Sequence, residues 1–163
     1  MYNAHMSDLS SSHNANSFQD LLLPGPPAFL AAGFEPQEMH QLVAYLFALF
    51  RQPPDLRPLT PVHWHQSVAQ CLGMASHETF PQEGVPQQAP ETLPRVLLVA
   101  GRRLSDLFRV VEFWVASQLP RPIFAAATDN NLHFSIGQLI MHLEEEQRRM
   151  MQGENPEDHS NKS

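Results

Sequence analysis

Three polar residues, Thr128, Asn131 and His133, lie between an expected strand and an expected helix near the end of the chain. In open sheets of parallel strands, ligands bind beyond the carboxyl ends of the strands. The free N–H groups at the start of the next helix attract anions. These residues therefore form a candidate ligand-binding turn. The alternative is that Asn131 shapes the turn while Thr128 or Ser135 caps the helix.

Two consecutive arginines, Arg102 and Arg103, follow the strand expected at residues 96–100 and precede another helix. Guanidinium groups at such a turn can hold a phosphate or a carboxylate through paired hydrogen bonds. Together with the turn after Thr128, they would line a site for a small anionic ligand. The alternative is that both arginines are ordinary solvated charges.

A cysteine and several histidines lie within a short stretch of the first half of the chain. His63 and His65 have the His-x-His spacing of metal ligands, and a thiolate from Cys71 would suit zinc. His77 lies further along the chain, and no known spacing places a fourth ligand. Cys71 also falls on the apolar stripe of a short helix, where a free cysteine is commonly a small buried hydrophobe. The same residues could be drawn as a nucleophile and its base, although nothing in the sequence fixes that geometry.

The elements that would position these residues appear in the same order twice. Short apolar segments at 28–32, 96–100 and 123–128 predict buried strands, and Pro58 makes residues 55–60 an edge strand. Apolar residues at helical spacing follow each strand.

The second half of the chain aligns with the first half at a constant offset of 68 residues, without a gap. Eleven of the 49 aligned positions from Pro26 to Met74 are identical, where average composition would give roughly three. This predicts an α/β fold of two βαβα repeats, with a small, mainly parallel or mixed sheet flanked by helices. The alternative is convergence of two similar segments.

Composition sets the boundaries of the domain. We expect disordered, polar tails at both ends and a proline-rich linker between the repeats. The predicted segments are a tail at 1–25, repeat 1 at 26–74, the linker at 75–93, repeat 2 at 94–151 and a second tail at 152–163.

The overall charge and residue content exclude several classes of protein. A net charge of −7 argues against a nucleic-acid binder, and the sequence contains no apolar run long enough to span a membrane. A single cysteine excludes a disulfide framework and, with no targeting segment recognised, suggests a cytoplasmic protein. The sequence contains no glycine-rich phosphate loop and no zinc-protease motif, so we expect no cofactor.

The segment after Pro122 resembles the C-terminal signature of a bacterial family catalogued as domain of unknown function 3783. That signature runs roughly P-x-x-A-x-x-T-P-x-N-x-x-W-T-x-x-x-L, followed by a helix rich in glutamate. Thr128, Asn131 and Leu139 match it directly, whereas Phe134 replaces the tryptophan. Ser135 stands for the threonine and Asp129 for the second proline, although the first repeat has Thr60-Pro61 at the equivalent place. The resemblance covers residues 95–150 and implies an α/β fold without a known activity.

These observations favour a non-catalytic protein that binds another protein or a second copy of itself. Phe47, Phe50, Phe113 and Trp114 are expected in the core. The apolar surface of both long helices is nevertheless wider than the one stripe that a small sheet can cover. The remaining apolar surface could be covered by a second chain, which suggests homodimerisation. The alternative function is a small-ligand or anion-binding domain that uses the turns after the second strand of each repeat.

Overall fold

Four strands form one mixed sheet in the order β2-β1-β3-β4. The structure is a computed structural model and describes residues 20–74 and 84–153. Each outer strand runs parallel to its inner neighbour, and the two inner strands are antiparallel. The strands are β1 (Ala28–Ala32), β2 (Leu56–Leu59), β3 (Val96–Ala100) and β4 (Ile123–Ala126).

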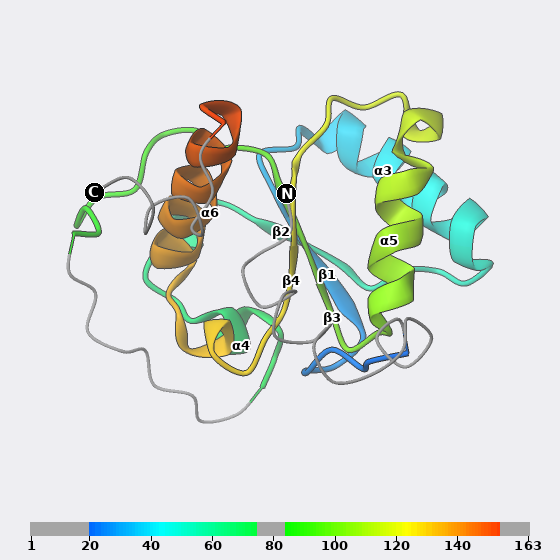
Figure 1. The fold of residues 1–163 in the computed structure, drawn as a ribbon, viewed down its shortest axis with the longest axis horizontal. Coiled ribbons are helices and arrows are strands. Elements are labelled where there is room, and N and C mark those ends of the chain that lie inside the picture. The colour runs from blue at the N-terminus through cyan, green and yellow to red at the C-terminus, as the bar shows by residue number, and fades with distance from the viewer. Residues whose placement is uncertain (1–19, 75–83, 154–163) are drawn as a thin grey trace.

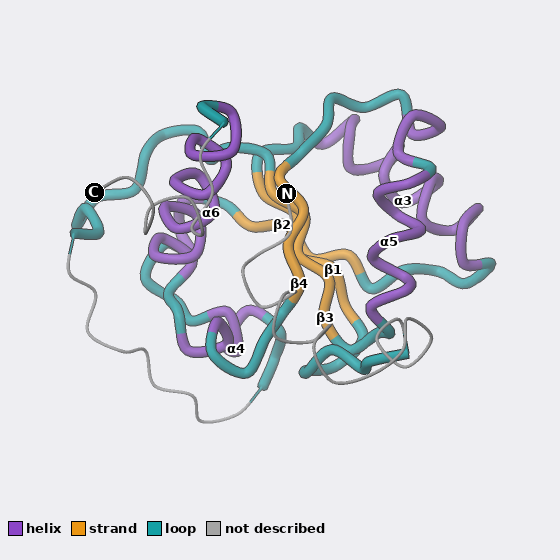
Figure 2. The backbone as a smooth tube through the Cα atoms, in the orientation of Figure 1, coloured by secondary structure: helices purple, strands orange, loops and turns teal. Residues whose placement is uncertain are grey.

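Helices cover both faces of this sheet and make three layers (Figure 1, Figure 2). One face carries α3 (Pro36–Phe50), α5 (Leu104–Glu112) and the short 3-10 helix η2 (Trp114–Ser117). The other carries α4 (Val68–Cys71), α6 (Ile136–Met151) and the 3-10 helices η1 (Pro61–His63) and η3 (Asn131–His133). Within the described ranges, no helix combines the length and apolar composition that crossing a membrane requires. The α/β class and the mixed sheet flanked by helices are as the sequence predicts.

Alternation of side chains along the inner strands divides the core into two clusters. Phe29 and Leu97 pack towards α3 and α5, while Leu30 and Leu98 pack towards α4 and α6. Side chains in a strand point to opposite faces in turn. A short strand that is apolar at every position therefore contributes to both clusters, and β1 and β3 are buried along their whole length.

The strand registers follow the 68-residue offset. In the antiparallel pair, Leu30 lies opposite Leu98, its own equivalent in the offset alignment. In the two parallel pairs, Leu30 lies opposite Arg57 and Leu98 lies opposite Ala125, which are also equivalent positions. The arrangement is compatible with the predicted internal repeat and has an approximate twofold axis through the Leu30–Leu98 pair.

Two glycines, one after each inner strand, allow the backbone of one repeat to approach the backbone of the other closely. Gly33 and Gly101 both have positive φ, at 79° and 66°. A Cβ atom on Gly33 would overlap the backbone of Pro94, and one on Gly101 would overlap the backbone of Pro26. The two contacts are reciprocal under the offset, so glycine is required at both positions for the same steric reason.

The predicted tail at 1–25 extends too far along the chain. Residues 20–25 are described and follow the loop after β3: Leu23 N–H donates to Arg102 O at 2.8 Å, and Leu104 N–H donates to Leu21 O at 2.8 Å. Leu23 is buried in the cluster beneath α3 and α5. These backbone bonds join residues far apart in sequence, which a local reading cannot detect. Residues 1–19, like most of the predicted tail at 152–163, lie outside the described residues.

The predicted linker at 75–93 is only partly described, and the described part is not fully solvated. Trp64 Nε1 donates to Pro86 O at 2.8 Å, and His65 Nε2 lies 2.6 Å from Gln87 O. Leu93 is buried in the cluster beneath α6. Backbone carbonyls of the linker thus accept hydrogen bonds from the Trp64 and His65 rings, and these bonds hold the end of the linker against repeat 1.

Two aromatic residues expected in the core lie on the surface instead. Trp114 is buried and Phe50 packs against the core, as predicted. Phe47 and Phe113, however, are 47% and 49% exposed. Phe47 is two helical positions from the buried Tyr45 and so points away from the sheet.

We predict that Gly101→Ala lowers the free energy of unfolding by about 3 kcal/mol or more, because it adds a steric overlap to the cost of a positive φ. Gly84→Ala is the matched control: Gly84 also has a positive φ, at 82°, but no atom lies within 4 Å of its added Cβ. It should lose only about 1 kcal/mol. Urea denaturation of both variants measures the difference, and equal losses would contradict the close approach of Gly101 to Pro26.

Candidate functional site

The turn after β4 is closed by reciprocal hydrogen bonds between Thr128 and Asn131. Asn131 Oδ1 accepts from Thr128 N–H at 2.8 Å, and Thr128 Oγ1 accepts from Asn131 N–H at 3.0 Å. Asn131 Nδ2 also donates to Ala126 O at 3.0 Å, and the residue is buried. The polar atoms of the Asn131 side chain thus hold the end of an edge strand. His133 lies two residues further on, half-buried at the end of η3.

The start of α6 is engaged by the first half of the chain. Ile136 N–H donates to Gln66 O at 2.9 Å, Gly137 N–H donates to Trp64 O at 3.0 Å, and Gln138 N–H donates to Ser135 Oγ at 3.0 Å. Gly137 also leaves room for the Trp64 ring, which a Cβ atom would strike. The N–H groups that were expected to attract an anion are therefore bonded within the protein.

The turns after β2 and β4 cross each other on the α4 and α6 side of the sheet. Ser67 and Ser135, which are equivalent under the offset, pair as an isolated antiparallel bridge. Val68 N–H donates to Phe134 O at 2.9 Å next to that bridge. Both serines are buried, and each caps its own helix. The two turns therefore form a packed backbone junction.

The two candidate arginines make their contacts on the other side of the sheet. The guanidinium of Arg102 lies 4.2 Å from the centre of the Phe50 ring, and its Nε lies 3.1 Å from a carboxylate oxygen of Asp106. Arg103 pairs with Asp20 at 3.2 Å. Phe50 packs in the layer of α3 and α5. Asn131 lies in η3, which leads from β4 to α6 on the opposite face of the sheet. The contacts of the two arginines with Phe50, Asp106 and Asp20 thus lie apart from the Thr128 turn.

The candidate metal ligands are also held separately. His63 Nδ1 accepts from Thr60 N–H at 2.9 Å, while His65 contacts Gln87 O. Burial raises the pKa of the Cys71 thiol to about 11, which disfavours a thiolate at neutral pH. Within residues 20–74 and 84–153, no group of three or more His, Cys, Asp and Glu side chains is placed to hold a metal ion. His77 lies outside the described residues.

A small pocket of about 230 Å³ lies between the start of β4 and the end of α6. It combines the Arg121 side chain with apolar groups, and the Arg121 guanidinium lies 5.1 Å from the centre of the Phe124 ring. Phe124 is buried, and its side chain belongs to the core cluster beneath α3 and α5. The sequence did not indicate this pocket, because its two sides come from separate elements. It is lined by Arg121, Pro122, Ile123, Phe124, Gln147, Met150 and Met151.

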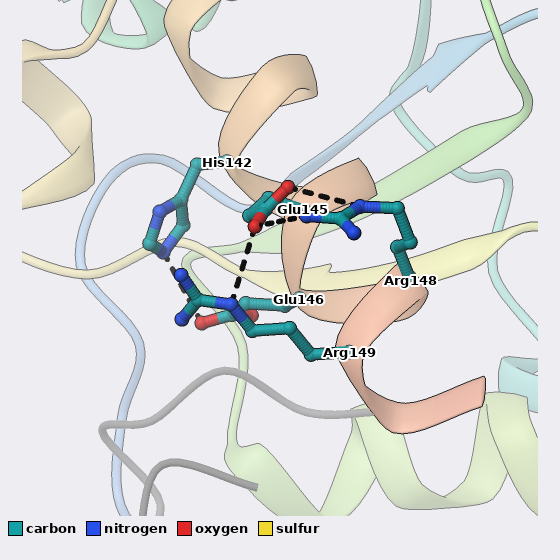
Figure 3. A network of polar contacts seen from close by, with 5 residues as sticks. All are labelled: His142, Glu145, Glu146, Arg148 and Arg149. Carbon is teal, nitrogen blue, oxygen red and sulfur yellow. Dashed lines mark hydrogen bonds and ion pairs between the residues drawn. The ribbon is translucent and has the colours of Figure 1, made fainter. Parts of the chain in front are cut away.

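The outer face of α6 carries a network of charged side chains (Figure 3). The Glu145 carboxylate accepts from both Arg148 and Arg149, and His142 pairs with Glu146 at 3.2 Å. The hydrogen bond that the His142 ring donates to the Glu146 carboxylate raises the pKa of His142 above its ordinary value. This pair stabilises the fold at pH values below the unfolded histidine pKa, and the effect is lost as the pH rises through the raised folded value. Exposed pairs of this kind add little stability, so the network is an ordinary solvated helix face.

The sequence analysis expected Phe47 and Phe113 in the core, but they are exposed on α3 and next to η2. Val43 is 41% exposed and Val115 is 89% exposed, and the exposed Phe47 and Phe113 lie near them in sequence. The sequence did indicate an additional apolar surface, because both long helices are apolar over more than one stripe. Periodicity alone does not show which of two stripes faces the sheet.

We predict that Asn131→Ala destabilises the protein by about 2–4 kcal/mol, since it leaves the half-buried Thr128 N–H and the buried Ala126 carbonyl without their partner. Asn130→Ala is the matched control, because Asn130 is exposed and its side chain caps no helix. It should change the unfolding free energy by less than about 0.5 kcal/mol. Chemical denaturation distinguishes the two, and an unchanged stability of the Asn131 variant would show that its role is not structural.

A family model matches the second half of the chain. No match was found among the curated proteins or among the solved structures. The match spans β3 to α6, so it includes the Thr128–Asn131 turn and the Ser135 helix cap on which the predicted resemblance rested. Residues 95–150 of this chain match the family described as Domain of unknown function (DUF3783).

Proposed function

We propose that this protein is a non-catalytic protein-interaction module whose contact surface is the outer side of α3 and η2. The observation that carries the proposal is the exposure of four large apolar side chains on neighbouring elements of one helical layer. These residues, called the α3–η2 surface below, are Val43, Phe47, Phe113 and Val115.

A buried aromatic contact fixes the elements that carry these four side chains to each other. The rings of Tyr45 and Trp114 pack edge to face, with their centres 5.4 Å apart. The Tyr45 hydroxyl donates to Val110 O at 2.6 Å, and burial raises its pKa to about 12. Val43 and Phe47 flank Tyr45 on α3, while Phe113 and Val115 flank Trp114. The exposed residues are therefore carried on neighbouring elements that are fixed to each other.

Exposed apolar residues support an interaction role only when they are grouped. Single exposed hydrophobic side chains are normal on protein surfaces, whereas contiguous apolar patches commonly mark binding sites. Covering the exposed half of one such side chain is worth about 1 kcal/mol. Four of them form a useful centre for an interface, since large apolar anchors near the centre supply most of the binding energy.

The alternative role in binding an anion or small ligand at the turns has weaker support. The side-chain polar atoms of Asn131 are used within the chain, and Arg102 is paired with Asp106. We therefore do not adopt that function.

Photo-crosslinking at the α3–η2 surface tests the interaction role. We predict that benzoylphenylalanine placed at Phe47 in full-length protein, irradiated in cells, gives covalent adducts of higher mass. The same probe at Val62, which is 78% exposed on η1 in the other layer, is the matched control and should give few adducts. Adducts are compared by denaturing electrophoresis and mass spectrometry. Equal adduct patterns from both positions, or none from Phe47, would contradict the proposal.

A further inference from the structure

We infer that the partner of the α3–η2 surface is a second copy of this chain, docked through α3 in an antiparallel arrangement. This inference rests on the proposed interaction role and names its partner. It follows from the outer face of α3, from the charges at the two ends of that helix and from a comparison with the equivalent part of repeat 2.

The outer face of α3 has an uncharged, apolar middle. Val43, Ala44, Phe47 and Ala48 are all exposed, and their spacing of one and four residues places them on one stripe. Ala44 and Ala48 are small enough to let another helix approach to an axial separation of about 8 Å. Phe47 and Val43 stand beside them as the larger groups that would fill the spaces on a partner helix.

The two ends of α3 carry opposite exposed charges. Glu35 is the residue at the helix N-cap, and Arg51 is the residue at the C-cap. Both are exposed, and none of the exposed residues between them on α3 is Asp, Glu, Lys or Arg. An antiparallel copy brings the end of each α3 that carries Glu35 beside the end of the other α3 that carries Arg51. A parallel copy would instead place like charges together, and would also align the two helix dipoles unfavourably.

Repeat 2 provides an internal comparison for this surface. The positions equivalent to Val43, Ala44 and Phe47 are Val111, Glu112 and Val115. Glu112 puts an exposed carboxylate in the middle of that stripe, and α5 ends at this residue. A twofold contact through α5 would bring two carboxylates together, whereas a twofold contact through α3 would not. The geometry therefore selects α3 as the element at the dyad, with η2 at its rim.

The surface is also suited to a twofold contact because it is complementary to itself. In an isologous dimer each residue of the patch meets a residue of the same patch on the partner. The apolar stripe of α3 supplies the shared centre, and the pair of opposite end charges sets the direction. A dimer of this form needs no feature that the chain lacks.

Sedimentation equilibrium of the full-length protein across micromolar to millimolar concentrations tests the inference. We predict a reversible dimer. Ala44→Glu places a carboxylate close to the dyad and should weaken the dimer by at least about a hundredfold. Val62→Glu makes the same chemical change at an exposed position on the opposite layer and should leave the dimer unchanged. Circular dichroism verifies that both variants remain folded.

A charge exchange tests the antiparallel direction separately. Glu35→Arg and Arg51→Glu should each weaken the dimer about tenfold, because each turns two attractive contacts into repulsive ones. The double variant restores the opposite charges and should recover most of the original affinity. General destabilisation of α3 would be additive and would not produce this recovery.

Each outcome has a distinct meaning. A dimer that Ala44→Glu breaks and that the double charge exchange restores supports the inference. A monomer at every concentration, or a dimer insensitive to Ala44→Glu, overturns it. If the protein is monomeric but the probe at Phe47 still captures a different protein, the inference fails while the proposed interaction role stands. If neither a dimer nor adducts form, both fail.

Discussion

The antiparallel pairing of β1 with β3 is the contact on which the rest of the structure depends. Leu30 and Leu98 face each other at its centre, and both are fully buried. Every other strand is added outward from this pair in a parallel register. Each half sends one helix to each face: α3 and α4 come from the first half, and α5 and α6 from the second. Because the two halves meet with opposite strand direction, the turns after β2 and β4 can cross and bond to each other through Ser67 and Ser135.

Much of the fold is predictable because strongly apolar strands and proline boundaries are local signals. Pro58 indicates an edge strand, since its missing N–H costs nothing only where no neighbouring strand needs a donor, and β2 is indeed an outer strand of the sheet. The offset of 68 residues also anticipates the matching strand registers. Strand order and the antiparallel centre could not be read from sequence, because either direction of β3 buries the same apolar side chains.

The candidate sites were harder to predict because residue type does not reveal the partner. Asn131 has the atoms to bind a ligand, but its hydrogen bonds go to Thr128 and Ala126. Arg102 and the Thr128 turn follow neighbouring parallel strands, yet the chain leaves those strands towards opposite faces. The errors at Phe47 and Phe113 have a related cause, since two apolar stripes on one helix make the buried side ambiguous. The surface they form is the basis of the proposed function.

The central claim is that the outer face of α3 is buried by a second copy of the chain, and methyl NMR tests it most directly. Val43 and Val62 are both exposed valines, one on α3 and one on η1 in the opposite layer. As protein concentration rises, the account predicts that the Val43 methyl signals shift and lose solvent accessibility while those of Val62 stay constant. Val43 signals that do not change with concentration would contradict it.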